Sequence, residues 1–500
     1  MTKRVPCPPA PKPLEDYAAP FDELFTSLAQ RRSFREYLEG LLLPRERNKT
    51  LTALAGAEPI VGAQTPTVQR LQFFLSESPW DADAVNACRL ARLLGDPATT
   101  PHEQGVLVID DTGDRKAGTK TAHVARQYLG SVGKTDNGIV AVTSLWADER
   151  VYFPLHVTPY TPASRLPGGK RDPAFRTKPK LAVELIDAAL EAGIAFRAVV
   201  ADCFYGDNLE FEDTLGAAEL PYVLALKPSK GTWAPVEAAH SPEEATEALR
   251  WGGPDAPGDW SPVVRRYRDG HEDTWWAAEL TFAGYGPDRA TRLIVATTDP
   301  ATLPAQSTWY LATNLPRPGS PQADDSPLVP ADLTEVVRLY GLRNWVEQSY
   351  KQVKQELGWA DFMVRSDRAI RRHWQLVHCA FSFCWQTYFA AESVTEPTAL
   401  REAAPSPEAV AEDPATDKIA GRGENGDRAG LRRGREGRRR EFMAHGAAPG
   451  AGLARSLALP AALLAGVVER VPAARTPSLA GRRRRRSPAQ PLSPLLTKYR

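Results

Sequence analysis

"GVLVIDDTGDRKAGTKTAHVARQYLGSVGKTDNGIVAVTSLWADERVYFPLHV", the stretch from Gly105 to Val157, decides the fold class of this chain. It opens with a short β-branched run that ends at Asp110, and a loop rich in Gly and Lys follows. Two further strand-like segments then meet at a turn near Ala147 to Glu149. This pattern predicts three consecutive antiparallel strands.

Helices and strands alternate on the carboxyl-terminal side of these strands. Residues 179–193, "PKLAVELIDAALEAG", have helical apolar spacing, and the strand-like run "FRAVVAD" ends at Asp202. We expect a helix after Gly206, followed by the strand-like run "PYVLALKP". Such alternation is typical of an α/β domain, and together with the antiparallel strands it predicts a mixed sheet.

The composition changes along the chain and suggests several segments. Residues 1–20 are rich in proline, and we expect them to be disordered, whereas residues 21–96 have the spacing of a small helical domain. An α/β domain in two parts, 103–228 and 304–390, is expected on either side of a β-rich insertion at 229–303. Residues 391–500 have few aromatic side chains and indicate a disordered, low-complexity basic tail.

The charge distribution limits the classes of function. The formal net charge is +1, but Lys418–Arg500 holds 19 basic and 5 acidic residues, an excess of +14 that leaves −13 for the residues before it. An acidic main body argues against a protein that wraps nucleic acid over its whole surface, so any such surface must be local. Five scattered cysteines without a CxxC pair argue against a disulfide framework or a zinc knuckle. We find no signal peptide and no run of about 20 apolar residues, and we expect the protein in the cytoplasm.

A second stretch, "YGLRNWVEQSYKQVKQE" from Tyr340 to Glu356, mixes acidic and basic residues. If it forms one helix, Tyr340, Arg343, Glu347 and Lys354 fall within an arc of about 60°. An apolar stripe lies beside this arc and is suited to packing on a sheet. Spacing of this kind is more often a solvated helix surface, so other acidic residues must decide its meaning.

Asp110 and Asp202 supply those acids, because each ends an expected strand of the same α/β region. A single strand-end aspartate is usually a helix cap or a turn former. Three carboxylates brought together with Glu347 need a compensating cation, and hard oxygen ligands suit Mg²⁺ or Mn²⁺. Two such ions about 4 Å apart activate an oxygen nucleophile at a phosphodiester, and Arg343 and Lys354 would bind flanking phosphates. These residues indicate a phosphoryl-transfer centre on DNA.

With these residues assembled, the sequence resembles the insertion-sequence transposases of the DDE superfamily, in the group with a Tyr-x2-Arg-x3-Glu-x6-Lys signature. Tyr340, Arg343, Glu347 and Lys354 match this spacing at every position. The runs "VLVIDDTGD" and "VVADCFYGD" resemble the two aspartate motifs of the group. The resemblance extends from about residue 21 to about residue 389.

The resemblance implies a ribonuclease H-like catalytic domain with a β-rich insertion, and an all-helical amino-terminal DNA-binding domain. It implies Asp110, Asp202 and Glu347 as catalytic metal ligands, with Asp111 as an open alternative because one residue reverses the strand face. It also implies the reaction: metal-dependent hydrolysis at transposon ends and strand transfer into target DNA, with Mg²⁺ or Mn²⁺ as cofactor. The partners would be terminal inverted repeats and target DNA, with a dimer in the synaptic complex.

Further basic residues are candidates for DNA contact beside Tyr340, Arg343 and Lys354. Lys116, Lys120, Arg126 and Lys134 crowd the region after Asp110, where contact with the DNA backbone and simple solvated charge both fit the sequence. Arg365, Arg368, Arg371 and Arg372 allow the same two interpretations. For His123 and His156 we expect structural hydrogen bonds.

Tryptophans of the insertion are a further set of candidates. Members of the group can stack a flipped base on such a tryptophan, and the sequence does not choose among those available. They are Trp233, Trp251, Trp260, Trp275 and Trp276. For each of them, packing in the core is the competing interpretation.

The tail departs from the group, whose members continue with aromatic-rich sequence past the catalytic helices. Here "GRGENGDRAGLRRGREGRRREF" and "AGRRRRRSPAQ" stand instead. They are either a basic disordered arm that adds nonspecific DNA affinity or the product of a reading-frame change. Three functions stay open: a cut-and-paste transposase, a catalytically impaired DNA-binding protein derived from one, and a plain metal-dependent nuclease.

Overall fold

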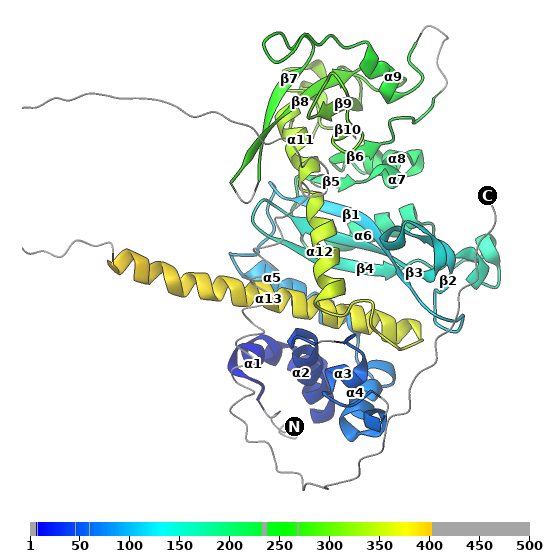
Figure 1. Ribbon diagram of the computed structural model, residues 1–500, viewed down its shortest axis with the longest axis vertical. Coiled ribbons are helices and arrows are strands. Elements are labelled where there is room, and N and C mark those ends of the chain that lie inside the picture. Colours follow the sequence, from blue (N-terminus) through cyan, green and yellow to red (C-terminus); the bar gives the residue numbers. More distant parts are fainter. Residues whose placement is uncertain are drawn as a thin grey trace, which may run out of the picture.

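Figure 1 shows the computed structural model of the chain, which describes residues 7, 9–45, 47–59, 61–232, 238–267 and 270–402. The side chains of residues 61 and 392–402 are excepted. Trp233 and everything beyond residue 402 lie outside this description, so the expectations for that tryptophan and for most of the tail are not tested. No helix in these ranges is long and apolar enough to cross a membrane.

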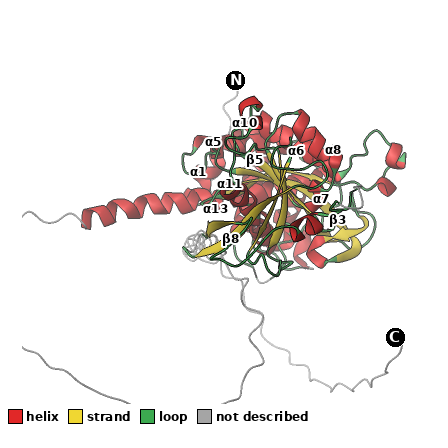
Figure 2. Ribbon diagram, turned by 90° about the horizontal axis from the view of Figure 1, so that it is seen from above, coloured by secondary structure: helices red, strands yellow, loops and turns green. Residues whose placement is uncertain are grey.

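The described residues form one ten-stranded mixed sheet at the centre of the molecule (Figures 1 and 2). Its strands are β1 Val106–Arg115, β2 Ala125–Leu129, β3 Lys134–Ala147, β4 Tyr152–Pro159, β5 Ala198–Ala201, β6 Tyr222–Leu226, β7 Ser261–Arg266, β8 Glu272–Leu280, β9 Arg292–Thr297 and β10 Thr308–Thr313. The order is β2-β3-β1-β5-β6-β10-β9-β8-β7, and β4 pairs with the same edge of β3 as β2. Antiparallel β1, β3 and β4 beside parallel β1, β5 and β6 confirm the predicted ribonuclease H-like α/β class.

β1 is longer than the sequence suggests. Its parallel pairing with β5 covers only Val106–Ile109, so Asp110 stands at the end of that pairing, and Asp202 directly follows β5. The prediction that the strand ends at Asp110 is nevertheless wrong, because the other edge of β1 stays hydrogen-bonded to β3 as far as Arg115. β2 likewise occupies part of the region expected to be a loop.

The strands of the insertion extend this sheet. β10 pairs with β6 on one edge and with β9 on the other, and β8 and β7 follow outward. A small apolar cluster, to which Trp260, Leu280 and Val295 belong, covers one face here. The insertion strands lie at the top of Figure 1. Their pairing with β6 through β10 makes them part of the same continuous hydrogen-bonded sheet as β1 and β5.

Helices cover the sheet and form a separate group at the amino terminus (Figure 1). They are α1 Lys12–Ala18, α2 Leu28–Leu42, α3 Leu51–Leu54, α4 Pro66–Ser76, α5 Ala82–Gly95, α6 Lys178–Glu191, α7 Cys203–Gly206, α8 Leu209–Ala217, α9 Pro242–Glu247, α10 Pro321–Asp325, α11 Leu333–Gly341, α12 Asn344–Gln355 and α13 Asp367–Glu402. The expectation of disorder up to residue 20 is wrong for α1. Leu14 and Tyr17 are buried there, and Glu15 forms an ion pair with Arg35 of α2.

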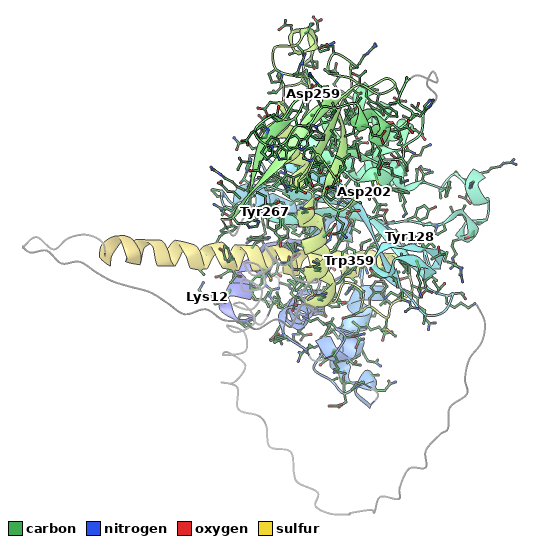
Figure 3. The ribbon with its side chains drawn as sticks, turned by 45° about the horizontal axis from the view of Figure 1, so that its top comes forward. Lys12, Tyr128, Asp202, Asp259, Tyr267 and Trp359 are labelled. Carbon is green, nitrogen blue, oxygen red and sulfur yellow. The ribbon has the colours of Figure 1, made fainter. Side chains whose placement is uncertain are left out.

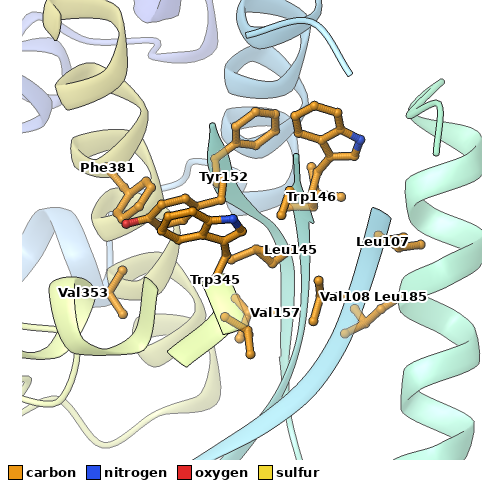
Figure 4. Packing of buried hydrophobic residues seen from close by; sticks show 14 of the residues in the cluster. Leu107, Val108, Leu145, Trp146, Tyr152, Val157, Leu185, Trp345, Val353 and Phe381 are labelled. Carbon is orange, nitrogen blue, oxygen red and sulfur yellow. The ribbon is translucent and has the colours of Figure 1, made fainter. Parts of the chain in front are cut away.

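α13 crosses between the sheet and the amino-terminal helices and joins them (Figure 1). Its Phe381 packs on Tyr152 of β4, whose ring stacks on Trp345 of α12 at a centroid distance of 4.6 Å (Figure 4). Trp385 of α13 contacts the Tyr152 ring edge-on. Trp385 also donates a hydrogen bond to the Tyr152 carbonyl. This core fixes α12 on the sheet and thereby positions the signature residues.

The signature stretch is two helices and not the single helix expected from its spacing. α11 ends at Gly341 and α12 begins at Asn344, with i to i−3 hydrogen bonds at the junction from Arg343 to Tyr340 and from Val346 to Arg343. The guanidinium of Arg265 on β7 lies against this junction. A Cβ atom on Gly341 would stand only 2.8 Å from Arg265 Nη2, so glycine leaves room for the insertion to contact the signature.

Candidate active site

Two aspartates meet at one edge of the sheet because their strands are parallel neighbours. Asp110 follows the paired part of β1, and Asp202 follows β5 in the same register. Asp110 is nearly buried, and one of its oxygens accepts the N–H of Asp111 at 2.7 Å. Asp202 begins α7 and accepts the N–H of Phe204 at 3.0 Å. Asp202 is labelled in Figure 3, between the insertion strands above and α13 below.

Arg343 joins these two acids to Glu347. One of its terminal nitrogens lies 2.9 Å from Asp110 Oδ2 and 3.9 Å from Asp202 Oδ2, and the other lies 3.9 Å from Glu347 Oε1. All three predicted carboxylates therefore face one guanidinium. Glu347 is the most open of them, since its side chain is 64% exposed.

The charges at this edge do not balance. Burial raises the pKa of Asp110 to about 7, Arg343 opposes this shift, and the charge of Asp202 adds to it. Burial lowers the pKa of Arg343, but Asp110 together with Tyr340, Asp202 and Glu347 outweighs this effect, so the pKa of Arg343 is raised. Three carboxylates with one arginine are an arrangement that a further cation would stabilise.

The carboxylates are not assembled into a finished metal site. Among the residues that the structure describes, no three His, Cys, Asp or Glu side chains are grouped closely enough to hold a metal ion. The guanidinium of Arg343 lies between the three acids. Their oxygen donors and their excess negative charge fit a divalent ion chemically, so the assignment of Asp110, Asp202 and Glu347 as metal ligands stays a prediction.

Asp111 lies beside the site but has a different partner. Its carboxylate forms an ion pair with Lys178 of α6 at 3.1 Å, whereas Asp110 faces Arg343. Burial raises the pKa of Asp111, and Lys178 lowers it again in part. Adjacent residues of a strand point to opposite faces, which explains the separation. The geometry favours Asp110 as the member of the carboxylate group.

The remaining signature residues are mostly covered. Tyr340 is buried, and its ring contacts Trp309 edge-on at 4.9 Å. Lys354 lies 2.8 Å from Asp114 Oδ1. Their proposed DNA contacts would require rearrangement of these side chains, and that role stays a prediction.

Asp114 is a site residue that the sequence interpretation missed. Asp110 and Asp114 are four residues apart on β1 and so lie on the same face of the strand. Asp110 pairs with Arg343, and Asp114 pairs with Lys354. These two ion pairs connect β1 to the start and the last turn of α12. The period of two along "DDTGD" was the signal available in the sequence.

The basic candidates after Asp110 divide into two groups. Lys116 donates to the carbonyls of Ala360 and Phe362, and its ammonium lies 3.5 Å from the centroid of the Phe362 ring. Burial lowers its pKa to about 8. Lys120 and Arg126 are exposed, as is Lys134. Lys116 thus has a structural role in this chain, and the others stay available to solvent.

Two members of the second arginine group, Arg368 and Arg372, connect α13 to the amino-terminal helices. Arg368 and Arg372 donate to carbonyls of α4 and of the loop after it, at Ser76, Leu75 and Trp80. Arg371 pairs with Asp367. The structural interpretation accounts for these three, while Arg365 has an exposed side chain. His123 and His156 form hydrogen bonds, with Thr161 and Asp367 for the first and Ser144 for the second.

The described tryptophans of the insertion are largely packed. Trp260 and Trp275 are buried, and Trp251 and Trp276 contact each other edge-on with centroids 4.7 Å apart. Trp275 also packs on Trp309. Core packing therefore accounts for Trp260 and Trp275, whereas Trp251 and Trp276 keep partly exposed surfaces.

An aspartate at the end of the β1–β5 pairing, an aspartate directly after β5, and a glutamate on α12 all approach one arginine. This arrangement on a mixed sheet is the one expected of a ribonuclease H-like phosphoryl-transfer enzyme. The profile of the DDE superfamily endonuclease family matches residues 20–280. The chain is also 34% identical to the probable transposase for insertion sequence element IS701 of Microchaete diplosiphon, over 365 residues that make up 72% of this chain and 84% of that protein. The chain belongs to the DDE superfamily, as an insertion-sequence transposase that cleaves DNA and transfers strands.

Proposed function

We propose that this transposase moves its element by cut-and-paste transposition, in which the transposon ends are hydrolysed and the released 3′-hydroxyls attack target DNA. The observation that carries the proposal is the convergence of Asp110, Asp202 and Glu347 on one arginine at the edge of the sheet. Divalent Mg²⁺ or Mn²⁺ held by these carboxylates would activate the attacking oxygen and stabilise the leaving oxygen.

Arg343 has two tasks in this proposal. In the free chain its guanidinium offsets the repulsion among the three carboxylates. When the DNA end binds, a phosphate offers the guanidinium a bidentate partner, which releases the acids for the metal. Lys354 would exchange Asp114 for a neighbouring phosphate in the same way, and Tyr340 would support this side of the DNA.

The remaining part of the proposed DNA-binding surface consists of basic side chains that are exposed to solvent. Lys120 and Arg126 are exposed after β1 and are proposed contacts to the DNA backbone. The helical region 21–96 is the proposed DNA-binding domain for the terminal inverted repeats. Two ends must be held together before strand transfer, so we propose a dimer in the synaptic complex. We propose that the protein acts in the cytoplasm.

Cleavage of a duplex that carries the inverted repeats flanking the gene tests this function. With Mg²⁺ we expect nicks at the ends of the element, and Glu347→Gln should reduce their rate by about 100-fold or more, because it removes a charged metal ligand. Glu356→Gln is the matched control, since Glu356 lies exposed at the end of the same helix and outside the site. It should cleave like the wild type.

Other outcomes identify the alternatives. Binding to the ends without cleavage would indicate a catalytically impaired transposase, as the altered tail allows. Cleavage that ignores the end sequence would indicate a plain nuclease. Equal rates for Glu347→Gln and the wild type would refute the site assignment.

A further inference from the structure

We propose that the ring of Phe204 is a stacking surface for a nucleobase of the transposon end, next to the phosphate that is cleaved. This inference rests on the proposed function of the carboxylates and adds a base-binding position to it. It concerns the short helix α7, which directly follows Asp202.

Phe204 is exposed because of the way α7 is held. The next residue, Tyr205, takes the buried position and is fully covered. Gly206 packs so closely on β6 that a Cβ atom there would lie 2.0 Å from the Ala225 carbonyl oxygen. The turn therefore cannot rotate Phe204 into the core, and its side chain stays 46% exposed.

The exposed ring lies beside the carboxylates. The N–H of Phe204 donates to Asp202 Oδ1 at 3.0 Å. The ammonium of Lys178 lies 5.0 Å from the centroid of the Phe204 ring and 3.1 Å from Asp111 Oδ2. Because one DNA strand advances about 3.4 Å per nucleotide, a base belonging to a phosphate at Asp110 and Asp202 falls within reach of this ring.

The chemistry of the surroundings favours a base over other occupants. Asp110, Asp111 and Asp202 repel a phosphate that lacks a metal partner, whereas the flat face of a base carries no net charge. Stacking on an aromatic ring also tolerates any base sequence. Lys178 holds the ring in place by a cation–π contact while its own charge is largely balanced by Asp111. A protein partner on this ring would stand where the DNA must enter.

The experiment uses the full chain with Glu347→Gln, which keeps bound DNA uncut. Duplexes of the terminal repeat carry 2-aminopurine at successive positions around the cleavage site, and stacking on a protein ring quenches its fluorescence. We expect quenching at one position, and Phe204→Ala should abolish it and weaken binding by about 5- to 150-fold. Phe204→Trp should retain the quenching.

Two comparisons separate stacking from other effects. Leu209→Ala removes a side chain that is 60% exposed and lies five residues further on, and it should change neither quenching nor affinity. Phe204→Leu keeps an apolar side chain without a π face, and it should behave like Phe204→Ala. Thermal unfolding should be alike for all these variants, since the exchanged side chains are exposed.

Several results would overturn the inference. These are quenching that persists in Phe204→Ala, full quenching in Phe204→Leu, or no quenched position around the cleavage site. The proposed function fails by a different observation, which is the absence of metal-dependent cleavage by the wild-type chain. Binding and quenching in the Glu347→Gln background do not depend on cleavage, so the two failures are distinguishable.

Discussion

Two arginines with little exposed surface, Arg89 and Arg343, have opposite surroundings. Arg89 is fully buried where α5, β4 and α13 meet, a region that we call the helical junction. It donates to the carbonyls of Pro154 and Leu155, to Ser382 and to Asn86, all of them neutral oxygens. Arg343 lies at the edge of the sheet that carries the candidate active site, which we call the catalytic edge, and it faces three carboxylates.

The difference separates stability from function. At the helical junction Arg89 donates hydrogen bonds to neutral oxygens. Without these bonds the oxygens would be buried without a hydrogen-bond donor. At the catalytic edge three carboxylates face one arginine, and burial, together with the charge of Asp202, raises the pKa of Asp110. Natural chains keep such local conflicts where a substrate or ion later resolves them. Changes at the junction should therefore alter unfolding, and changes at the edge should alter the response to metal and DNA.

The largest expected effect is on the junction. Arg89→Met leaves several buried oxygens without donors, and we expect the free energy of unfolding to fall by about 3 kcal/mol or more. Urea titration followed by circular dichroism measures this decrease. Arg92→Met is the matched control on the same helix, since Arg92 has a partly buried hydrogen bond to Gln386 and its replacement should cost less. Equal decreases in both variants would contradict a special role for Arg89.

The catalytic edge should respond to metal instead. Arg343→Gln leaves the three carboxylates without their nearest cation, so the stability of the metal-free chain should fall by about 1–3 kcal/mol. Mn²⁺ should then raise the melting temperature of this variant more than that of the wild type, because no guanidinium has to be displaced.

Arg338→Gln is the comparison for this experiment. Arg338 pairs with Glu149 and Glu335 outside the catalytic edge, so its replacement should not change the response to Mn²⁺. If Mn²⁺ stabilised Arg343→Gln no more than the wild type, the competition between arginine and metal would be disproved.

Acid should weaken the packing between α2 and α13. Buried His373 bonds to Tyr37 and to the Gly358 carbonyl, and burial lowers its pKa to about 4. The unfolded chain therefore takes up the proton below about pH 6.5 and the folded chain only below about pH 4, so stability is full above pH 6.5 and falls as pH falls through this window. At pH 5 the decrease from this residue should be about 2 kcal/mol relative to pH 7.

Melting temperatures between pH 7 and pH 4 measure this effect. His373→Gln should be less stable at pH 7 but should be destabilised less on acidification than the wild type. His102→Gln, which changes an exposed histidine, should follow the wild-type curve. A pH profile of His373→Gln parallel to that of the wild type would rule out His373 as the cause.

The smallest effect should come from the exposed basic side chains of Lys120 and Arg126, which follow β1 in the sequence. Lys120→Ala with Arg126→Ala should lower the salt dependence of DNA binding by about one unit of slope for each phosphate that the variant no longer binds, with stability unchanged within about 0.5 kcal/mol. Lys116→Met should instead destabilise the chain and leave the slope unchanged, because Lys116 is bonded to two carbonyls. Binding curves at several salt concentrations decide between them.

The sequence located several strands of the sheet and named three candidate carboxylates. Local pattern located β3 to β6, and the resemblance selected Asp110, Asp202 and Glu347, which the structure brings around Arg343. These features depend on local patterns and on one spacing motif. They are visible without knowledge of the tertiary structure.

Other features depend on interactions between distant residues and were not predictable. The close approach of Arg265, which lies on an insertion strand about 75 residues earlier, to Gly341 is one example. β1 continues past Asp110 because β3 holds its outer edge. From the sequence, Lys116 and Arg372 are candidates for DNA binding. Their structural role becomes visible only from the hydrogen bonds that they donate to backbone carbonyls.

The continuous sheet has a consequence for how such enzymes diversify. β9 covers the outer edge of β10, so deletion of the insertion would expose a six-residue strand, Thr308–Thr313, to pairing with other chains. An insertion borrowed from a relative would have to supply a strand of matching register and a side chain that fits Gly341. Point substitutions within the insertion should therefore be tolerated more easily in evolution than replacement of the whole insertion by that of a relative. A version shortened by loss of β9 would first have to avoid aggregation through the exposed edge of β10.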